Sequence, residues 1–236
     1  YSVSITTEVK DTQGNALSEN YNWSFSTPPP IDWGSSFTLL SSFPADNSYV
    51  KQFSIEQLPE FCNQIREKLI EIVSRTGGHI GVNLGVVELT VALHYTFDFP
   101  DDSLFWDVGH QIYVHKMLTG RLKKLETNRQ NEGSPGYSFH KESIYDKVTS
   151  SHAGASLSLG LGSAIGNQIL KNNLYTISVI GDGSLVEGSS QEALNHIAVE
   201  NCKMLIILND NERAIEENFG GLHEYLKKRQ IGVEKQ

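Results

Sequence analysis

The stretch Val179–Asn211, VIGDGSLVEGSSQEALNHIAVENCKMLIILNDN, decides the expected fold. It completes an apolar, β-branched run over residues 175–180 that has the length of a buried strand. Gly181-Asp182-Gly183 ends this run, a helical pattern follows, and a second apolar run covers residues 204–208. The stretch therefore predicts a strand, helix, strand unit in an α/β protein, with a parallel sheet flanked by helices.

Polar groups follow both of these strands. Asp182 comes after the first strand and Asn211 after the second, and the carboxyl ends of parallel strands meet at the edge where open α/β sheets place their ligands. A carboxylate, an amide oxygen and nearby backbone carbonyls form the hard oxygen site that Mg²⁺ uses when it also holds phosphate. Gly181-Asp182-Gly183 alone is equally compatible with a tight turn, and the polar Asn209–Asn211 after the second strand favours the ligand site.

Composition limits the classes of protein to consider. At 236 residues, 39% hydrophobic and 20% charged, the chain fits one large globular domain or one domain with appendages. A net charge of −9 argues against nucleic-acid and anionic-membrane partners. Without a secretory signal or a transmembrane-length apolar run, we expect a cytoplasmic location. Cys62 and Cys202 indicate no disulfide framework, and a start at Tyr1 indicates a processed chain or a fragment.

The amino-terminal residues differ in pattern from the rest. Apolar and polar residues alternate at the start of residues 1–27 and again around Trp23, which predicts a short β-hairpin. This segment is similar to the end of a bacterial immunoglobulin-like repeat, although an ordinary hairpin decorating the main domain is an alternative. Pro28-Pro29-Pro30 lies in a linker over residues 28–38, and the main domain is expected over residues 39–236.

Helical spacing and turn signals predict the remaining elements. The expected helices cover residues 59–74, 84–97, 112–119, 155–170 and 222–229, with a strand at residues 104–106 and a long polar loop at residues 122–145. Glycines in the helix over residues 155–170 indicate close helix packing, because no strand precedes them as a dinucleotide fingerprint requires. The basic run over residues 115–124 fits either a solvated helix face or a polyphosphate site.

Three histidines stand at the ends of expected elements beside glycine or a small residue: His79, His110 and His152. Each alone is compatible with a structural or surface role. Because all three lie at loop junctions that can converge on one face, they are candidates for proton exchange or for donation to phosphate near neutral pH.

Longer motifs carry a family resemblance. TGGHIGVNLGVVELTVALHYTF (76–97), FWDVGHQIYVHKMLTGR (105–121) and NDNERAIEENFGG (209–221) resemble the amino-terminal domain of the 1-deoxy-D-xylulose-5-phosphate synthase family. The resemblance runs from about residue 39 to the end, and DVGHQ followed by HK-x-LTGR separates it from ordinary transketolases. It implies a thiamine-diphosphate-dependent transferase that condenses pyruvate with glyceraldehyde 3-phosphate and releases CO₂, in isoprenoid-precursor and thiamine biosynthesis.

The resemblance also implies roles for individual residues. Asp182, the side chain of Asn211 and the backbone carbonyl of Arg213 ligate Mg²⁺. His79 faces the substrate and is catalytic, and His110 is both catalytic and cofactor-lining. The other cofactor-binding residues are His152, Gly154, Gly181, Asp182, Gly183, Ser184 and Asn211.

Two departures from the family pattern are visible. The family's H-S-S-T is replaced by His152-Ala153-Gly154-Ala155, which removes hydroxyls near the cofactor, and GDGSLVEG carries Glu187 as transketolases do. The pyrimidine-binding and carboxy-terminal domains are missing, so we expect a truncated, inactive diphosphate-binding portion that works with a pyrimidine-binding domain in cis or in trans, as a homodimer. A split transketolase subunit and a non-enzymatic surface module remain alternatives.

Overall fold

The computed structural model describes residues 2–5, 21–24, 47–210 and 220–233. Its contacts divide the chain into two compact units, Tyr1–Phe37 and Thr38–Gln236. In the first unit, β1 (Ser2–Ile5) pairs antiparallel with β2 (Tyr21–Ser24), as the alternating pattern predicts. The linker over residues 28–38 lies outside the described residues, and the likeness to an immunoglobulin-like repeat stays a prediction.

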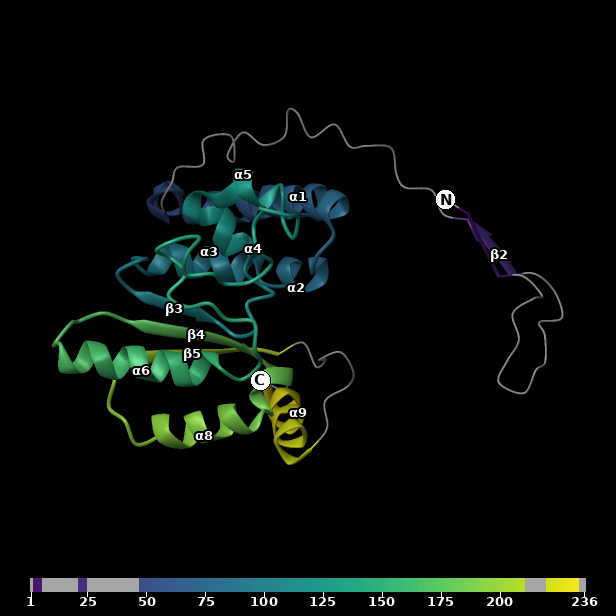
Figure 1. Ribbon diagram of the computed structural model, residues 1–236. Coiled ribbons are helices and arrows are strands. Elements are labelled where there is room, and N and C mark those ends of the chain that lie inside the picture. The colour runs from purple at the N-terminus through teal and green to yellow at the C-terminus, as the bar shows by residue number, and fades with distance from the viewer. Residues whose placement is uncertain (1, 6–20, 25–46, 211–219, 234–236) are drawn as a thin grey trace. The chain divides into compact units, whose positions relative to one another are not determined.

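The second unit is built on a three-stranded parallel sheet in the order β3-β4-β5 (Figure 1). The strands are β3 (Ser103–Trp106), β4 (Thr176–Gly181) and β5 (Met204–Asn209), where the apolar runs predict them. Gly181 lies opposite Asn209, so β4 and β5 end together. This register confirms the predicted strand, helix, strand unit and its shared carboxyl edge.

Helices α6 (Ser156–Ile169) and α8 (Gly188–Ile197) lie on one side of the sheet (Figure 1). An added Cβ at Gly160 would collide with Ser178 Oγ and would lie 2.8 Å from Met204 Cε, so this glycine allows α6 to approach the sheet closely. The sequence predicts close packing at the other glycines of α6 as well. This prediction is wrong for Gly162 and Gly166, because an added Cβ there meets no described atom within 4 Å.

Helices α1 (Leu58–Thr76), α2 (Ile80–Leu84), α3 (Val87–Thr96) and α4 (Tyr113–Lys116) form the layer on the other side (Figure 1). They follow short 3₁₀ turns at Asn47–Gln52 (η2) and Ile55–Gln57 (η3). Apolar residues of α1 at helical spacing are fully buried: Phe61, Ile65, Leu69 and Ile72. The predicted helix over residues 84–97 begins later than expected, because Leu84 ends α2 and Val86 is non-helical.

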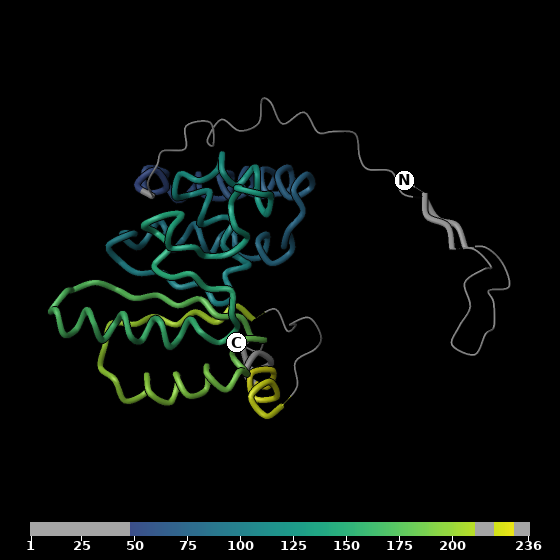
Figure 2. The backbone as a smooth tube through the Cα atoms, in the orientation of Figure 1, coloured from purple at the N-terminus to yellow at the C-terminus, as the bar shows by residue number. Residues whose placement is uncertain are grey.

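The connection between β3 and β4 passes through α4, a π-helical turn at Met117–Arg121 (η4) and α5 (Leu122–Leu125). It continues as the long polar loop that the sequence predicts, and Figure 2 traces this path through the helical layer. The loop is tied down by buried side chains, which are described with the site below.

A second apolar cluster lies where β4, β5 and α8 meet. Its buried members are Leu157, Ile180, Leu185 and Ala193. Leu222 and Leu226 of α9 (Gly221–Val233) pack against this cluster, which explains the predicted helix over residues 222–229. Among the described residues, none of the helices combines the length and apolar character that a membrane span needs. Cys62 and Cys202 are both free thiols, as expected.

Candidate functional site

The structure brings together two of the three candidate histidines. His79 immediately precedes α2 and His110 follows β3, and their rings meet edge to face with centroids 5.6 Å apart. Asn83 is fully buried and donates a hydrogen bond to the backbone carbonyl of each histidine. Two turns separated in sequence are thus joined at the residues that carry the imidazoles.

Asp107 connects the His110 turn to the segment that contains His152. Its carboxylate accepts hydrogen bonds from the N–H groups of Gly154 and Ser156, both at 2.9 Å. Asp107 is the buried residue that follows β3, so it fixes the start of α6 to the carboxyl edge of the sheet. His152 itself is exposed, and no ring contact joins it to His79 or His110 in the described part of the chain.

The carboxyl edge carries the predicted phosphate and metal residues. Asp182 directly follows β4, is 6% exposed and is the first residue of the short helix α7 (Asp182–Leu185). At the neighbouring strand end, Asn209 Nδ2 donates to Gln111 Oε1 at 3.2 Å. The motif residues around His110 and the end of β5 therefore lie at one edge of the sheet, as the parallel register requires.

Within the part of the chain that the structure describes, two buried polar side-chain atoms at this edge have no hydrogen-bond partner. They are His110 Nδ1 and Gln111 Nε2. Buried polar groups are nearly always hydrogen-bonded, so unpaired atoms at the carboxyl edge of the sheet fit a site for a bound polar group. The residues present therefore fit a diphosphate held with a divalent cation.

The remaining predicted metal ligands, Asn211 and Arg213, lie outside the described residues. Within the described ranges, no group of three or more His, Cys, Asp or Glu side chains could hold a metal ion. The predicted site would use one carboxylate, one amide and one backbone carbonyl together with phosphate oxygens, so it is a different kind of site and stays a prediction.

Three predicted cofactor residues lie around the junction of α7 and α8. Gly154 has φ 77°, and an added Cβ would lie 2.9 Å from Glu187 Cβ, so packing against the start of α8 already requires glycine. The carbonyl of Ser184 accepts a hydrogen bond from the Ser190 hydroxyl at 2.7 Å. Gly183 lies between Asp182 and Ser184 in the first turn of α7. These contacts shape the edge, and cofactor contact by these residues stays a prediction.

Burial controls the protonation of His110. Desolvation lowers the pKa of His110, the positive charge of a protonated His79 lowers it further, and Asp107 opposes both effects. At neutral pH the imidazole of His110 is therefore neutral and able to take up a proton.

In the basic run over residues 115–124, the side chains of His115, Lys116 and Arg121 are buried. For these three residues, the predictions of a solvated helix face and of a polyphosphate site are therefore both wrong. The Lys116 ammonium is fully buried and donates to Ser134 Oγ at 3.1 Å, Pro135 O at 2.6 Å and Glu142 Oε2 at 2.5 Å. Burial lowers the pKa of Lys116, whereas the hydrogen bond and charge of Glu142 raise it. Lys116 thus anchors the long loop to α4.

Arg121 makes a second anchor to the same loop. Its guanidinium donates to both oxygens of Asp146, at 2.8 and 2.9 Å, and also to Glu142 Oε2 at 3.2 Å. Thr119 accepts two further hydrogen bonds from Arg121. Although burial raises the pKa of Asp146, hydrogen bonds from His115 and Arg121 hold it well below its ordinary value.

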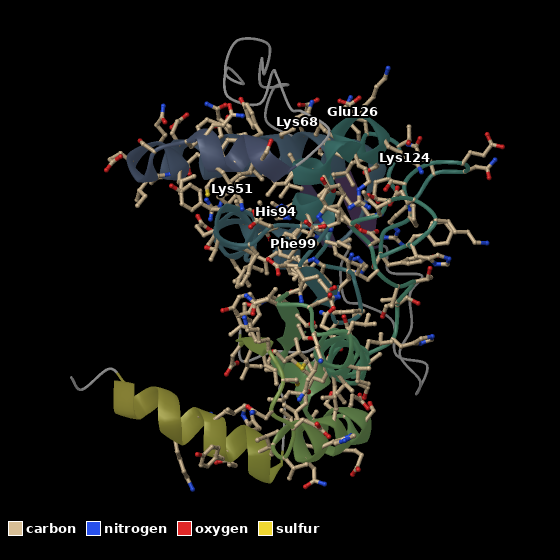
Figure 3. All side chains as sticks on the ribbon, turned by 90° about the vertical axis from the view of Figure 1, so that its left-hand side faces the viewer. Lys51, Lys68, His94, Phe99, Lys124 and Glu126 are labelled. Atoms are coloured by element: carbon tan, nitrogen blue, oxygen red, sulfur yellow. The ribbon has the colours of Figure 1, made fainter. Side chains whose placement is uncertain are left out.

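Two fully buried histidines extend this cluster. His115 Nε2 lies 3.4 Å from Asp146 Oδ1, and His115 Nδ1 lies 2.9 Å from His94 Nε2. Burial lowers the pKa of both imidazoles. Figure 3 shows His94 beside Phe99 inside the helical layer, with ring centroids 5.0 Å apart, whereas Lys124 and Glu126 lie at its outer edge.

The anchored loop forms a wall of a cavity of about 510 Å³ that opens beside His79. The lining residues are His79, Arg129, Gln130, Gly133, Ser134, Pro135, Gly136, Tyr137 and Phe139. The sequence pattern predicts a functional or mobile loop here, but the buried ion pairs that hold it are not visible from local spacing.

Comparison with known proteins decides the family. Residues 44–235 match the family model described as 1-deoxy-D-xylulose-5-phosphate synthase. The chain therefore belongs to the 1-deoxy-D-xylulose-5-phosphate synthase family. The family resemblance carried by the DVGHQ and HK-x-LTGR motifs is confirmed.

Individual members of the 1-deoxy-D-xylulose-5-phosphate synthase family are about half identical to this chain. The enzyme of Listeria innocua is 50% identical over 183 residues, covering 78% of this chain and 29% of its own length. The enzyme of Bacillus velezensis is 51% identical over 181 residues, covering 77% of this chain and 29% of its own length. The chain thus spans less than a third of the length of these relatives.

Solved transketolases share the fold. Transketolase from Leishmania mexicana superposes with a TM-score of 0.63 at 24% identity, covering 75% of this chain and 31% of that protein. A transketolase mutant from Pichia stipitis gives a TM-score of 0.63 at 22% identity, covering 69% of this chain and 28% of its own. The parallel sheet flanked by helices is therefore the α/β architecture that transketolases contain.

Proposed function

We propose that this chain is the diphosphate- and Mg²⁺-binding portion of a 1-deoxy-D-xylulose-5-phosphate synthase. The observation that carries the proposal is the shared carboxyl edge, where Asp182 follows β4 and Gln111 bonds Asn209 at the end of β5. The overall reaction would condense pyruvate with glyceraldehyde 3-phosphate and release CO₂. By the same family membership we propose a homodimer in the cytoplasm that includes a pyrimidine-binding domain.

The residues of this chain would divide the binding work between metal, diphosphate and substrate. Asp182 would hold Mg²⁺ together with the Asn211 side chain and the Arg213 carbonyl. The diphosphate would lie against Gly154, Gly181, Gly183 and Ser184, near His152. When bound, thiamine diphosphate supplies the carbon centre and electron sink that pyruvate decarboxylation needs.

The two paired histidines would serve the reaction as acid and base groups. His79 borders the cavity of about 510 Å³, which offers room for a small substrate beside its imidazole. His110 is neutral at neutral pH for the reasons given above and would exchange protons at its ring nitrogen. Positioned general acids and bases contribute roughly 10²–10⁴-fold to rate.

The metal assignment is tested by ligand-induced stabilisation of this chain. Thiamine diphosphate should raise the unfolding temperature of the wild type only when Mg²⁺ is present, because a ligand that binds the native state stabilises it. Asp182→Asn should abolish this rise, since it removes the charged ligand of the cation. An equal rise in Asp182→Asn and wild type would contradict the assignment.

Asp102→Asn is the matched control. Asp102 is as buried as Asp182, but it accepts hydrogen bonds from the N–H groups of Asp98 and Tyr175 at the amino end of the sheet. This variant should be less stable than the wild type and should keep the full Mg²⁺-dependent rise. Loss of the response in both variants would indicate a general folding defect.

The proposed division between domains is tested by complementation. This chain alone should not decarboxylate pyruvate, and activity should appear when separately expressed pyrimidine-binding and carboxy-terminal domains are added. Turnover by this chain alone would contradict the division. Glu187, an exposed residue at the start of α8, would then be the first carboxylate to replace.

A further inference from the structure

A single side chain joins the two histidine-bearing turns. Asn83 is fully buried on α2, and its Nδ2 group donates to His79 O at 2.7 Å and to His110 O at 2.8 Å. Its Oδ1 atom accepts a hydrogen bond from the Tyr113 N–H at 2.9 Å. Both amide hydrogens and the amide oxygen are therefore used, each on the backbone of a segment that borders the site.

Among the neighbouring contacts, those of Asn83 are the short hydrogen bonds that join the two turns. The Tyr113 hydroxyl accepts a hydrogen bond from the His79 N–H at 3.4 Å, which is long for this type of bond. Gly78 has φ 133°, and an added Cβ would lie 2.8 Å from the Tyr113 hydroxyl. The backbone conformation at Gly78, just before His79, thus favours glycine. The short hydrogen bonds that join the His79 turn to the His110 turn are those of Asn83.

We infer that Asn83 is a positioning residue that sets the relative orientation of the His79 and His110 imidazoles. Only a short side-chain amide offers two donors for the two carbonyls and an acceptor for the Tyr113 N–H. An aspartate would place a charge against both carbonyls, and an alanine would remove the side-chain partner of both carbonyls and of the buried Tyr113 N–H. The inference concerns the geometry of the two rings, and it rests on the proposed function only in taking His79 and His110 as acid and base groups.

The inference is tested on the full chain by NMR with labelled histidines. In the wild type, the edge-to-face rings should give a cross-ring nuclear Overhauser effect between His79 and His110. In Asn83→Asp and Asn83→Ala this effect should disappear, and the pKa of His110 should rise as its burial and its contact with His79 are reduced. Variants that fold and keep both wild-type signals would overturn the inference.

Thr90→Val is the matched control for loss of a buried hydrogen bond in the same layer. Thr90 is fully buried on α3, and its hydroxyl donates at 2.6 Å to Val86 O, which belongs to neither histidine turn. This variant should keep the cross-ring signal and the His110 titration at a comparable loss of stability. Loss of the cross-ring signal in Thr90→Val would overturn the inference, because the pair would then respond to stability alone.

A measurement on the wild type tests the inference even if the Asn83 variants do not fold. The Asn83 Nδ2 protons should exchange slowly with solvent, because Asn83 is fully buried and its Nδ2 group donates to the His79 and His110 carbonyls. Fast exchange of these protons would overturn the inference. Failure of the Mg²⁺ test above would leave these NMR results standing, so the positioning role and the proposed function can fail separately.

Discussion

Asp146→Asn should be among the most damaging single substitutions in the helical layer. The Asp146 side chain is fully buried, and it accepts hydrogen bonds from Arg121 at 2.8 and 2.9 Å and from the Phe139 N–H at 2.9 Å. An asparagine keeps the shape but loses the charge and one acceptor oxygen. The Arg121 guanidinium would then keep one amide acceptor and its hydrogen bonds to Thr119, and its closest carboxylate would be Glu142, at 3.2 Å.

The expected cost follows from the loss of one partner in a buried ion pair. Such a change typically costs about 3–5 kcal/mol, because the remaining charge is left uncompensated in the interior. For a unit of this size, each kcal/mol lowers the unfolding temperature by about 2–4 °C. Asp146→Asn should therefore lower it by about 6–20 °C, a large share of a typical stability of about 5–15 kcal/mol.

Thermal and urea unfolding, followed by circular dichroism, measure this effect. Lys124→Ala is the control, because Lys124 Nζ lies 3.4 Å from Glu142 on a side chain that is 47% exposed. Because the Lys124 ammonium is largely solvated and Glu142 keeps Lys116 and Arg121 as partners, the loss should be near the 0–1 kcal/mol typical of exposed pairs, at about 1 kcal/mol. The double variant Arg121→Met/Asp146→Leu should be less destabilised than Asp146→Asn. A loss below about 1 kcal/mol in Asp146→Asn would refute the reasoning.

Three further predictions concern pH, packing and the amino-terminal unit. Burial lowers the pKa values of His94 and His115 below the unfolded value of about 6.5, so below that pH the unfolded chain binds more protons than the folded chain. The free energy of unfolding, measured in urea, should not depend on these groups above pH 6.5 and should fall by up to about 1.4 kcal/mol per histidine per pH unit below it. A flat profile down to pH 5 would contradict this. Gly160→Ala should lower the unfolding free energy by about 1–3 kcal/mol through overpacking, whereas Gly162→Ala should raise it by about 0.5–1 kcal/mol. Equal unfolding temperatures for the two variants would show that Gly160 is not needed for close packing of α6 on the sheet. Deleting residues 1–30 should change the unfolding free energy of the second unit by less than about 2 kcal/mol, and a larger loss in differential scanning calorimetry would place the hairpin in its core.

Local patterns were sufficient to predict the sheet and its carboxyl edge. Apolar β-branched runs at residues 175–180 and 204–208 predict two buried strands, and the helix between them requires parallel pairing. Parallel pairing then places Asp182, which follows β4, beside the end of β5. This part of the fold follows from short-range sequence alone.

The buried ion pairs could not be predicted in the same way. Lys116 and Glu142 are distant in sequence, and each is ordinarily a surface residue type. Their burial depends on the path of the long loop, which no periodicity describes. Asp107 is similar, because the motif that contains it directs attention to His110, whereas its hydrogen bonds to Gly154 and Ser156 exist only once α6 meets β3.

Boundaries within the helical layer were also beyond local reasoning. One helix is expected over residues 84–97, whereas the structure has α3 over Val87–Thr96 and a separate short helix, α2, over Ile80–Leu84. The interruption places Asn83 between the two histidine turns, and this tertiary role outweighs the local preference for a continuous helix. Tertiary hydrogen bonds of this kind leave no trace in helix propensity.

The parallel order β3-β4-β5 has a consequence for how the unit folds. The connection from β4 to β5 is roughly three times shorter than the connection from β3 to β4, so closing it costs about 1 kcal/mol less chain entropy. We therefore expect β4, α8 and β5 to form the folding nucleus and β3 to join later. In refolding kinetics, Ile180→Val should mainly slow folding and Leu104→Ala should mainly speed unfolding. The reverse pattern would mean that the long polar loop and its ion pairs assemble first.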